Sequence, residues 1–221
     1  MQVEKKLEVS KAQCLMDEPF FATLLIRMPL KERNDIPTFA TDGWFIYYNR
    51  EFVETLSLDD TKFILLHEVL HPAFFHCTRR GHRDASLWNI AGDYAINPIL
   101  IESGLRPPKK VLYNKEYSGW TAEKIYDDIL ENAEIVKMAG CMEGDCGGTG
   151  VFTDGGDTEA KKAEVEAEWN QRLVAAAEAS KLRGTVPGAF EDYIKEFLDP
   201  KVPWHQTLRQ YARDQVKSDY N

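Results

Sequence analysis

Two histidines with three residues between them carry the clearest chemical signature in this sequence. His67-Glu68-Val69-Leu70-His71 has the pattern H-E-x-x-H and lies within a strongly apolar stretch. Residues four positions apart share one face of a helix, so the two imidazoles can bind a single tetrahedral zinc ion. Glu68 is offset by one position and can reach the side on which an activated water would sit. This spacing is typical of zinc hydrolases.

A zinc site of this kind needs a third protein ligand, and Asp93 is the strongest candidate. It lies in a second apolar stretch, where Asn89, Asp93 and Asn97 recur every four residues and form a polar stripe. A carboxylate on a buried helix needs a positive charge nearby, which a zinc ion held by the preceding helix would supply. We therefore predict His67, His71 and Asp93 as metal ligands and Zn²⁺ as the cofactor.

Two alternatives stay open for this third position. Asp93 could receive amide hydrogen bonds or pair with an arginine of the intervening loop. The loop arginines are Arg79, Arg80 and Arg83. His82, in the same loop, could complete a three-histidine site. His76 lies about 140° around the helix from His71 and is not expected to join the other ligands.

These ligands require two buried helices, and the sequence predicts both. The first is expected from Thr61 to about His76, after Ser57 as a capping residue. The second is expected from Leu87 to Asn97, with Ser86 as its cap and an end at Pro98 or shortly after.

The segment before these helices predicts a small sheet. Two short runs of aromatic and β-branched residues, 38–41 and 44–48, flank the turn residues Asp42 and Gly43. An Asp-Gly pair between such runs is a strong hairpin signal. Upstream, apolar residues recur at helical spacing between about Val3 and Arg27 and predict two helices.

The order of the expected helices and strands along the chain predicts an α+β fold in a single domain. We expect a metal-binding core over residues 1–139, a Gly- and Asp-rich loop over 140–157, and a helical C-terminal part of the same domain over 158–221. A capped helix follows Thr121, and a long charged helix is expected from Thr158 to Leu182. The apolar stripe of this long helix is expected to be Val165, Trp169, Leu173 and Ala176. The expected architecture is a small mixed sheet, a buried helix carrying the H-E-x-x-H pattern, and a largely helical C-terminal part.

Composition also limits the classes of partner and the compartment. The chain of 221 residues is 43% hydrophobic, which is enough to bury a full core. Its net charge of -9 argues against a mainly electrostatic interaction with nucleic acid or with an anionic membrane. We find neither a secretion signal nor a run of transmembrane length, and four scattered cysteines do not form a disulfide scaffold. These features predict a cytoplasmic protein, with Cys141 and Cys146 as unpaired loop thiols rather than half of a second metal site.

Three segments together resemble the metallopeptidase domains that precede a von Willebrand factor A-like domain in bacterial and phage proteins. They are Thr38–Gly43, Leu66–His71 and Leu87–Asn97. The resemblance implies a zincin-like fold, Asp93 as third metal ligand, and an AAA+ ATPase of the MoxR kind as a partner. The sequence departs from that pattern at Pro72, where an aliphatic residue would follow the second histidine. A proline there can kink the helix and change the position of Glu68.

The expected reaction is peptide hydrolysis with Glu68 as general base. In a zincin-like fold, an edge strand beside the motif helix can hold an extended peptide by strand addition. Thr38, Phe39, Ala40 and Thr41 are the predicted substrate-binding residues. The alternative is an inactive adaptor module, in which zinc joins two buried helices and the protein acts with the ATPase.

Overall fold

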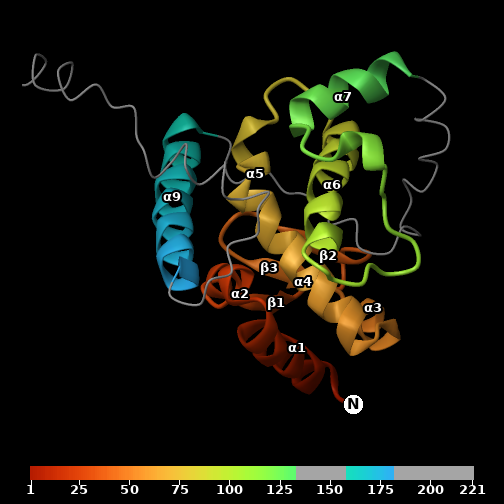
Figure 1. Cartoon of the computed structure of the whole chain (residues 1–221), viewed down its shortest axis with the longest axis vertical. Coiled ribbons are helices and arrows are strands. Elements are labelled where there is room, and N and C mark those ends of the chain that lie inside the picture. Colours follow the sequence, from red (N-terminus) through yellow and green to blue (C-terminus); the bar gives the residue numbers. More distant parts are fainter. Residues whose placement is uncertain (133–157, 182–221) are drawn as a thin grey trace, which may run out of the picture.

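The computed structural model describes residues 1–132 and 158–181 (Figure 1). Three predicted features lie outside the described residues. They are the Gly- and Asp-rich loop, the Cys141–Cys146 pair, and the helical segments expected after Leu182.

The motif helix, α4 (Leu58–Ala73), is the central element of the fold. It contacts α1 (Val3–Asp17) and α2 (Pro19–Leu25) on one side, α6 (Ala85–Glu102) on another, and α9 (Glu159–Lys181) on a third. The smaller helices are α3 (Arg50–Thr55), α5 (His76–Arg79), the 3₁₀ turn η1 (Lys115–Tyr117) and α7 (Ala122–Glu131). Every residue of α4 from Thr61 to Ala73 except Lys62 is buried, so the helix is enclosed on several sides.

Both ends of α4 follow from local chemistry. At its start, Ser57 Oγ accepts a hydrogen bond from the Asp60 amide at 3.0 Å, and Asp60 Oδ2 accepts one from the Ser57 amide at 3.2 Å. This capping box confirms the predicted start region. The helix ends at Ala73, before the predicted end at His76, because Phe75 adopts a left-handed conformation with φ 56°. His76 therefore begins a separate helix, α5.

The second buried helix, α6, is longer than predicted at both ends. Its N-cap is Asp84, whose side chain accepts a hydrogen bond from the backbone, and not Ser86. The end was predicted at Pro98 or shortly after, and the helix continues through this proline for a further turn to Glu102. The proline removes one amide from the helix, but the buried side chains of Ile99 and Leu100 hold the last turn against the core.

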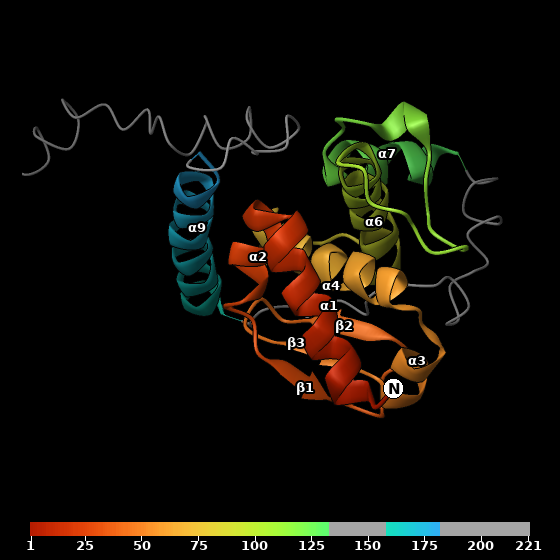
Figure 2. The same ribbon diagram turned by 60° about the horizontal axis from the view of Figure 1, so that its bottom comes forward.

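The sheet is small and mixed, as predicted. Its order is β1 (Leu30–Glu32), β3 (Ile46–Tyr48) and β2 (Phe39–Thr41). Strands β2 and β3 are antiparallel, with Phe39 opposite Tyr48, and form the predicted hairpin. Strand β1 pairs in parallel with β3 and was not predicted from the sequence. Figure 2 shows the sheet on one side of α4, with α6 and α7 on the opposite side.

The described helix after the loop docks on the turn of this hairpin. Its buried stripe is Val165, Trp169, Leu173 and Ala176, the same residues that the sequence pattern predicts. Trp169 Nε1 donates a hydrogen bond of 2.8 Å to the carbonyl oxygen of Gly43. The side chain of Asp42 orders the turn by accepting hydrogen bonds of 2.8 Å from the amides of Trp44 and Phe45. Helix α9 is therefore part of the same core as the sheet and α4.

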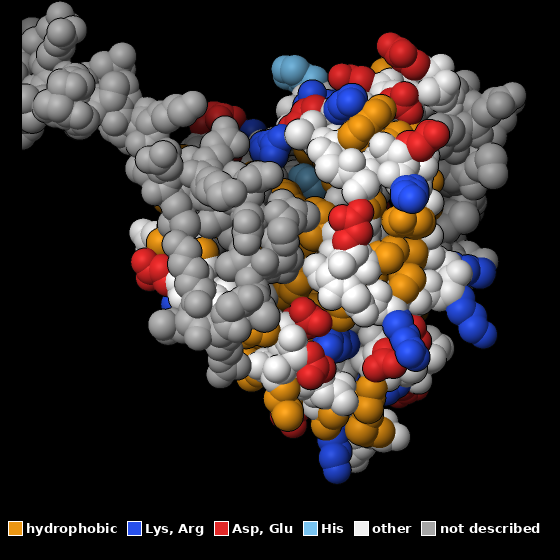
Figure 3. Space-filling view, in the orientation of Figure 1, with side chains coloured by type: hydrophobic (Ala, Val, Ile, Leu, Met, Phe, Trp, Pro, Cys, Tyr) orange, Lys and Arg blue, Asp and Glu red, His pale blue; other side chains and the backbone are white. Residues whose placement is uncertain are grey.

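Within residues 1–132 and 158–181, the buried apolar side chains form two clusters, and α6 contributes to both. One cluster joins α1, α2, α4, the sheet and α9 to the C-terminal half of α6. The other joins the N-terminal half of α6 to η1 and α7. None of the helices in the described part of the chain is long and apolar enough to span a membrane. On the face shown in Figure 3, acidic and basic side chains are interspersed rather than gathered into one basic patch.

Candidate metal centre

The structure brings the three predicted metal ligands together at the interface of α4 and α6. His67 Nε2 lies 3.1 Å from Asp93 Oδ1 and 3.1 Å from His71 Nε2. His71 Nε2 lies 3.3 Å from the same carboxylate oxygen. One donor atom of each side chain lies within 4.8 Å of the other two, and all three residues are buried. Helical spacing places the imidazoles on one face of α4, and packing of α6 adds the carboxylate.

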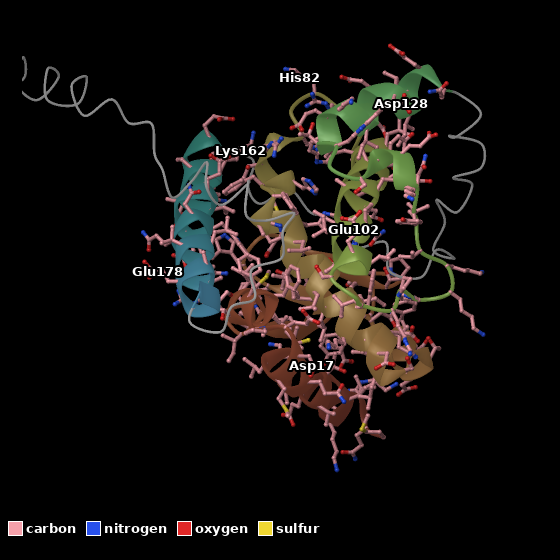
Figure 4. The ribbon with its side chains drawn as sticks, viewed as in Figure 1. Asp17, His82, Glu102, Asp128, Lys162 and Glu178 are labelled. Atoms are coloured by element: carbon pink, nitrogen blue, oxygen red, sulfur yellow. The ribbon has the colours of Figure 1, made fainter. Side chains whose placement is uncertain are left out.

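The two alternatives for the third position are an arginine partner for Asp93 and a ligand role for His82. Arg79, at the end of α5, forms an ion pair with Glu123 on α7 at 2.7 Å, while Asp93 contacts the two imidazoles. His82 is exposed, and Figure 4 shows it at the outer end of the connection between α5 and α6, away from α4. Among the described residues, the three-residue group that can hold a metal is therefore His67, His71 and Asp93.

Glu68 lies beside this group with its carboxylate shielded from solvent. The residue is 0% exposed, and neither of its side-chain oxygens has a hydrogen-bond partner among the residues that the structure describes. Burial raises the pKa of Glu68 to about 8, although the nearby charge of His67 opposes this shift. A buried carboxylate without a partner is costly for stability, so its retention points to a role other than packing. Pro72 follows Glu68 in the last turn of α4, and the helix continues through it to Ala73.

The ionisable groups at this interface influence one another through burial and charge. Burial favours neutral His67, but the charge and hydrogen bond of Asp93 outweigh it and raise the pKa of His67. Burial likewise opposes ionisation of Asp93, but its contacts with both imidazoles hold its pKa below the usual value. Burial lowers the pKa of His71 and, more strongly, that of His76. The metal-free site therefore favours an ion pair between His67 and Asp93, with His71 neutral.

The donor set fits a divalent metal ion. Two imidazole nitrogens and one carboxylate oxygen converge from two rigid helices, and these are ligand types that zinc accepts in open catalytic sites. The unpaired carboxylate of Glu68 adds negative charge beside them, which a cation would offset. The chemistry of these residues is therefore consistent with a metal held between α4 and α6.

Two polar residues that the sequence analysis did not assign to the site contact its imidazoles. Asn97 Oδ1 lies 2.9 Å from His67 Nδ1, and His76 Nδ1 lies 3.2 Å from His71 Nδ1. Asn97 belongs to the polar stripe of α6. Its position one turn after Asp93 is the feature of the sequence that could have predicted its place beside the metal ligands. No sequence signal places His76 here, because its approach depends on the left-handed turn at Phe75.

The predicted substrate-binding residues lie close to α4. Strand β2 contacts α4 and is an edge strand of the described sheet. Thr38, Phe39, Ala40 and Thr41 are each at most 1% exposed. Binding of a peptide along this strand would therefore require its edge to become accessible, and the role of these residues stays a prediction.

The chain belongs to the protein family described as "Putative metallopeptidase domain", whose model matches residues 2–221. The convergent histidines and carboxylate lie within this match and agree with the metal that the description implies. Neither the curated proteins nor the solved structures give a significant match to the chain.

Proposed function

We propose that this protein is a zinc-dependent metallopeptidase with a minimal zincin-like arrangement. The observation that carries the proposal is Glu68. It is a fully buried carboxylate that has no hydrogen-bond partner within residues 1–132 and 158–181, and it lies beside three convergent metal-ligand side chains. Membership of the metallopeptidase family supports the same reaction class. A general base must lie next to the atom whose proton it accepts, and its pKa should be close to the working pH.

In this proposal, His67, His71 and Asp93 hold the metal, and the chain supplies the proton transfers. When bound, zinc lowers the pKa of a water and withdraws electron density from a peptide carbonyl. Glu68 accepts the proton of the attacking water and passes it to the leaving amine. The raised pKa of Glu68, about 8 before a metal binds, reflects the apolar surroundings that would also exclude competing water.

The substrate class that fits this site is an extended peptide. Strand β2 lies at a sheet edge beside α4, the position from which a peptide could add as a further strand. We therefore retain Thr38–Thr41 as the proposed substrate-binding strand. Because these residues and Glu68 are buried, access to the site requires a rearrangement. An AAA+ ATPase is a proposed partner, since such enzymes use ATP to rearrange other proteins.

The test replaces Glu68 by Gln, which keeps the shape and removes the proton acceptor. Glu68→Gln should retain zinc and the folded state, while zinc-dependent cleavage of an unfolded peptide pool falls on the order of a thousandfold. Glu131→Gln, at an exposed position on α7, is the matched control and should keep full activity. Undiminished cleavage by Glu68→Gln would exclude Glu68 as the base.

A second candidate function is a metal-stabilised adaptor without peptidase activity. The observation that favours it is the burial of the whole site, since His67, Glu68, His71 and Asp93 are each at most 2% exposed. A structural metal needs no open position, and it would fix α4 against α6. If wild type shows no zinc-dependent cleavage, with or without an ATPase partner, and Glu68→Gln supports the biological role equally well, the adaptor function replaces the peptidase.

A further inference from the structure

We infer that Asn97 and His76 are positioning residues that select which ring nitrogen of His67 and of His71 faces the metal. This inference rests on the proposed metal site. It assigns to Asn97 and His76 the orientation of the two histidine ligands. The role of each follows from the direction of its hydrogen bonds and from the limits on what each atom can donate or accept.

The orientation of Asn97 is fixed by the backbone. Its Nδ2 lies 2.8 Å from the carbonyl oxygen of Leu112, which can only accept a hydrogen bond. The amide nitrogen must therefore face Leu112, and Oδ1 must face His67. Because Oδ1 can only accept, the hydrogen of this 2.9 Å contact belongs to Nδ1 of His67. Asn97 is 1% exposed, so water does not compete for the position.

This arrangement decides the state of the other ring nitrogen of His67. With a hydrogen on Nδ1, the neutral ring has a lone pair on Nε2, which lies 3.1 Å from Asp93 Oδ1. A lone pair facing a carboxylate oxygen is unfavourable unless a cation lies between them or Nε2 gains a proton. In the metal-free protein, a proton on Nε2 would turn this contact into a hydrogen bond to the carboxylate. A metal ion replaces that proton, which is the exchange that metal binding requires.

His76 plays the corresponding part for His71. The two Nδ1 atoms lie 3.2 Å apart, so one of them must donate and the other accept. For His71 to present an unprotonated Nε2 to the metal, its Nδ1 must carry the hydrogen and His76 Nδ1 must accept it. A neutral imidazole has one ring nitrogen with a hydrogen and one without, so His76 Nδ1 can accept when its hydrogen is on Nε2.

The surrounding structure holds His76 in place on several sides. Its carbonyl oxygen accepts a hydrogen bond of 2.9 Å from Trp88 Nε1, and its ring stacks on Phe74 at a centroid distance of 5.9 Å. Gly92 of α6 makes room for the ring, because a Cβ atom there would lie 2.9 Å from His76 Nδ1. With Phe75 in its left-handed turn, these contacts bring the fifth residue after His71 back against it. Such support is expected where a ring orientation matters.

Zinc affinity, measured with zinc alone against a competing chromophoric chelator, tests the part played by Asn97. Asn97→Leu removes the acceptor and should weaken zinc binding about 10- to 100-fold. Asn97→Asp keeps an acceptor for His67 but loses the donor to Leu112, so it should lose stability while zinc affinity stays within a few fold of wild type. Asn49→Leu is the matched control, because the amide of Asn49 bonds Ile36 and caps α3 far from the site. It should lower stability and leave zinc affinity unchanged.

The same measurement tests His76, with His82 as the control. His76→Phe keeps a ring between its neighbours but removes the acceptor, and should weaken zinc binding to a similar degree. His82→Phe changes an exposed histidine and should have no effect. In the zinc-loaded protein, ¹⁵N NMR of the imidazoles should show a hydrogen on Nδ1 and none on Nε2 for both His67 and His71.

The outcomes separate this inference from the metal site itself. A folded wild type that binds no zinc would overturn the metal site and the inference with it. Zinc binding that is tight in wild type and equally tight in Asn97→Leu and His76→Phe would overturn the positioning role alone. So would NMR spectra that place the hydrogen on Nε2 and the zinc on Nδ1.

Discussion

Lys6 and Glu68 are two of the ionisable side chains buried in the described part of this protein, and their surroundings differ. Lys6 of α1 is 7% exposed, and its Nζ donates hydrogen bonds to the carbonyl oxygens of Val53, Glu54 and Leu56 at 2.8, 3.2 and 2.6 Å. Glu68 of α4 is 0% exposed, and its two oxygens have no hydrogen-bond partner in the described part of the chain. The lysine is therefore satisfied by the fold, whereas the glutamate is not.

This difference separates a structural use of a buried charge from a functional one. Lys6 binds the carbonyl groups at the end of α3, which need donors because no further helical turn supplies them. Its charge completes the local structure and leaves nothing for a ligand to satisfy. Glu68 keeps an unmet hydrogen-bonding capacity beside a group of metal-ligand atoms. The unsatisfied carboxylate, rather than burial alone, marks the site.

The largest expected effect is the loss of the metal. The purified chain should carry about one zinc per molecule, and His67→Ala with His71→Ala should carry none, since two of three ligands are removed. Chelation should lower the melting temperature of wild type but not of the double variant, because only the former is stabilised by bound metal. Elemental analysis and thermal denaturation measure both effects. His82→Ala is the control and should bind zinc normally; unchanged metal in the double variant would contradict the site.

The next effect concerns stability and pH in the metal-free protein. The pKa of Glu68 is raised from 4.5 to about 8 on folding, so the folded state binds the proton more tightly than the unfolded state. Its favourable contribution is complete below about pH 4.5 and is lost as pH rises through about 8. Glu68→Gln cannot lose a proton, so at pH 8 it should be more stable than wild type by a few kcal/mol.

Urea denaturation of both metal-free proteins at several pH values measures this difference. The two free energies of unfolding should be similar at pH 4.5 and diverge as pH increases. A difference between the two free energies of unfolding that stays constant with pH would show that Glu68 has a partner in solution. Glu68 and Lys6 would then both be satisfied buried charges.

The smallest expected effect lies at the other buried charge. Lys6→Met removes the donor shared by three carbonyl groups and should lower the free energy of unfolding by about 1–3 kcal/mol at neutral pH. Zinc affinity should not change, because Lys6 lies at the end of α3 and not at the α4–α6 interface. Lys5→Met, at an exposed position of the same helix, is the control. A loss of zinc in Lys6→Met would show that the two regions are coupled.

Elements governed by neighbours in sequence were predicted well. The start of α4 follows from Ser57 and Asp60, the hairpin from Asp42 and Gly43, and the buried stripe of α9 from its helical spacing. Each depends on contacts within a few residues, which propensity and periodicity describe. The last turn of α6, beyond the expected range Leu87–Asn97, forms because burial in the core outweighs the local cost of Pro98.

The candidate site shows the same division. The pairing of His67 with His71, and the offset of Glu68, follow from one helix. Asp93 was inferred from a polar stripe, but its contact with both imidazoles depends on the packing of α6 against α4. Strand β1 gave no signal in the sequence, because it pairs in parallel with β3 and not with a strand that follows it directly through a turn.

The sequence by itself determined the chemical types at the centre and their order along α4, because helical geometry fixes the direction of side chains four residues apart. Only the tertiary structure decided which groups meet them. Asn97 reaches His67 across 30 residues, and His76 returns to His71 through a single left-handed residue. Likewise, whether the Glu68 carboxylate finds a hydrogen-bond partner depends on the side chains of every element packed around it. Such contacts arise from the packing of separate helices, for which local residue patterns carry little information.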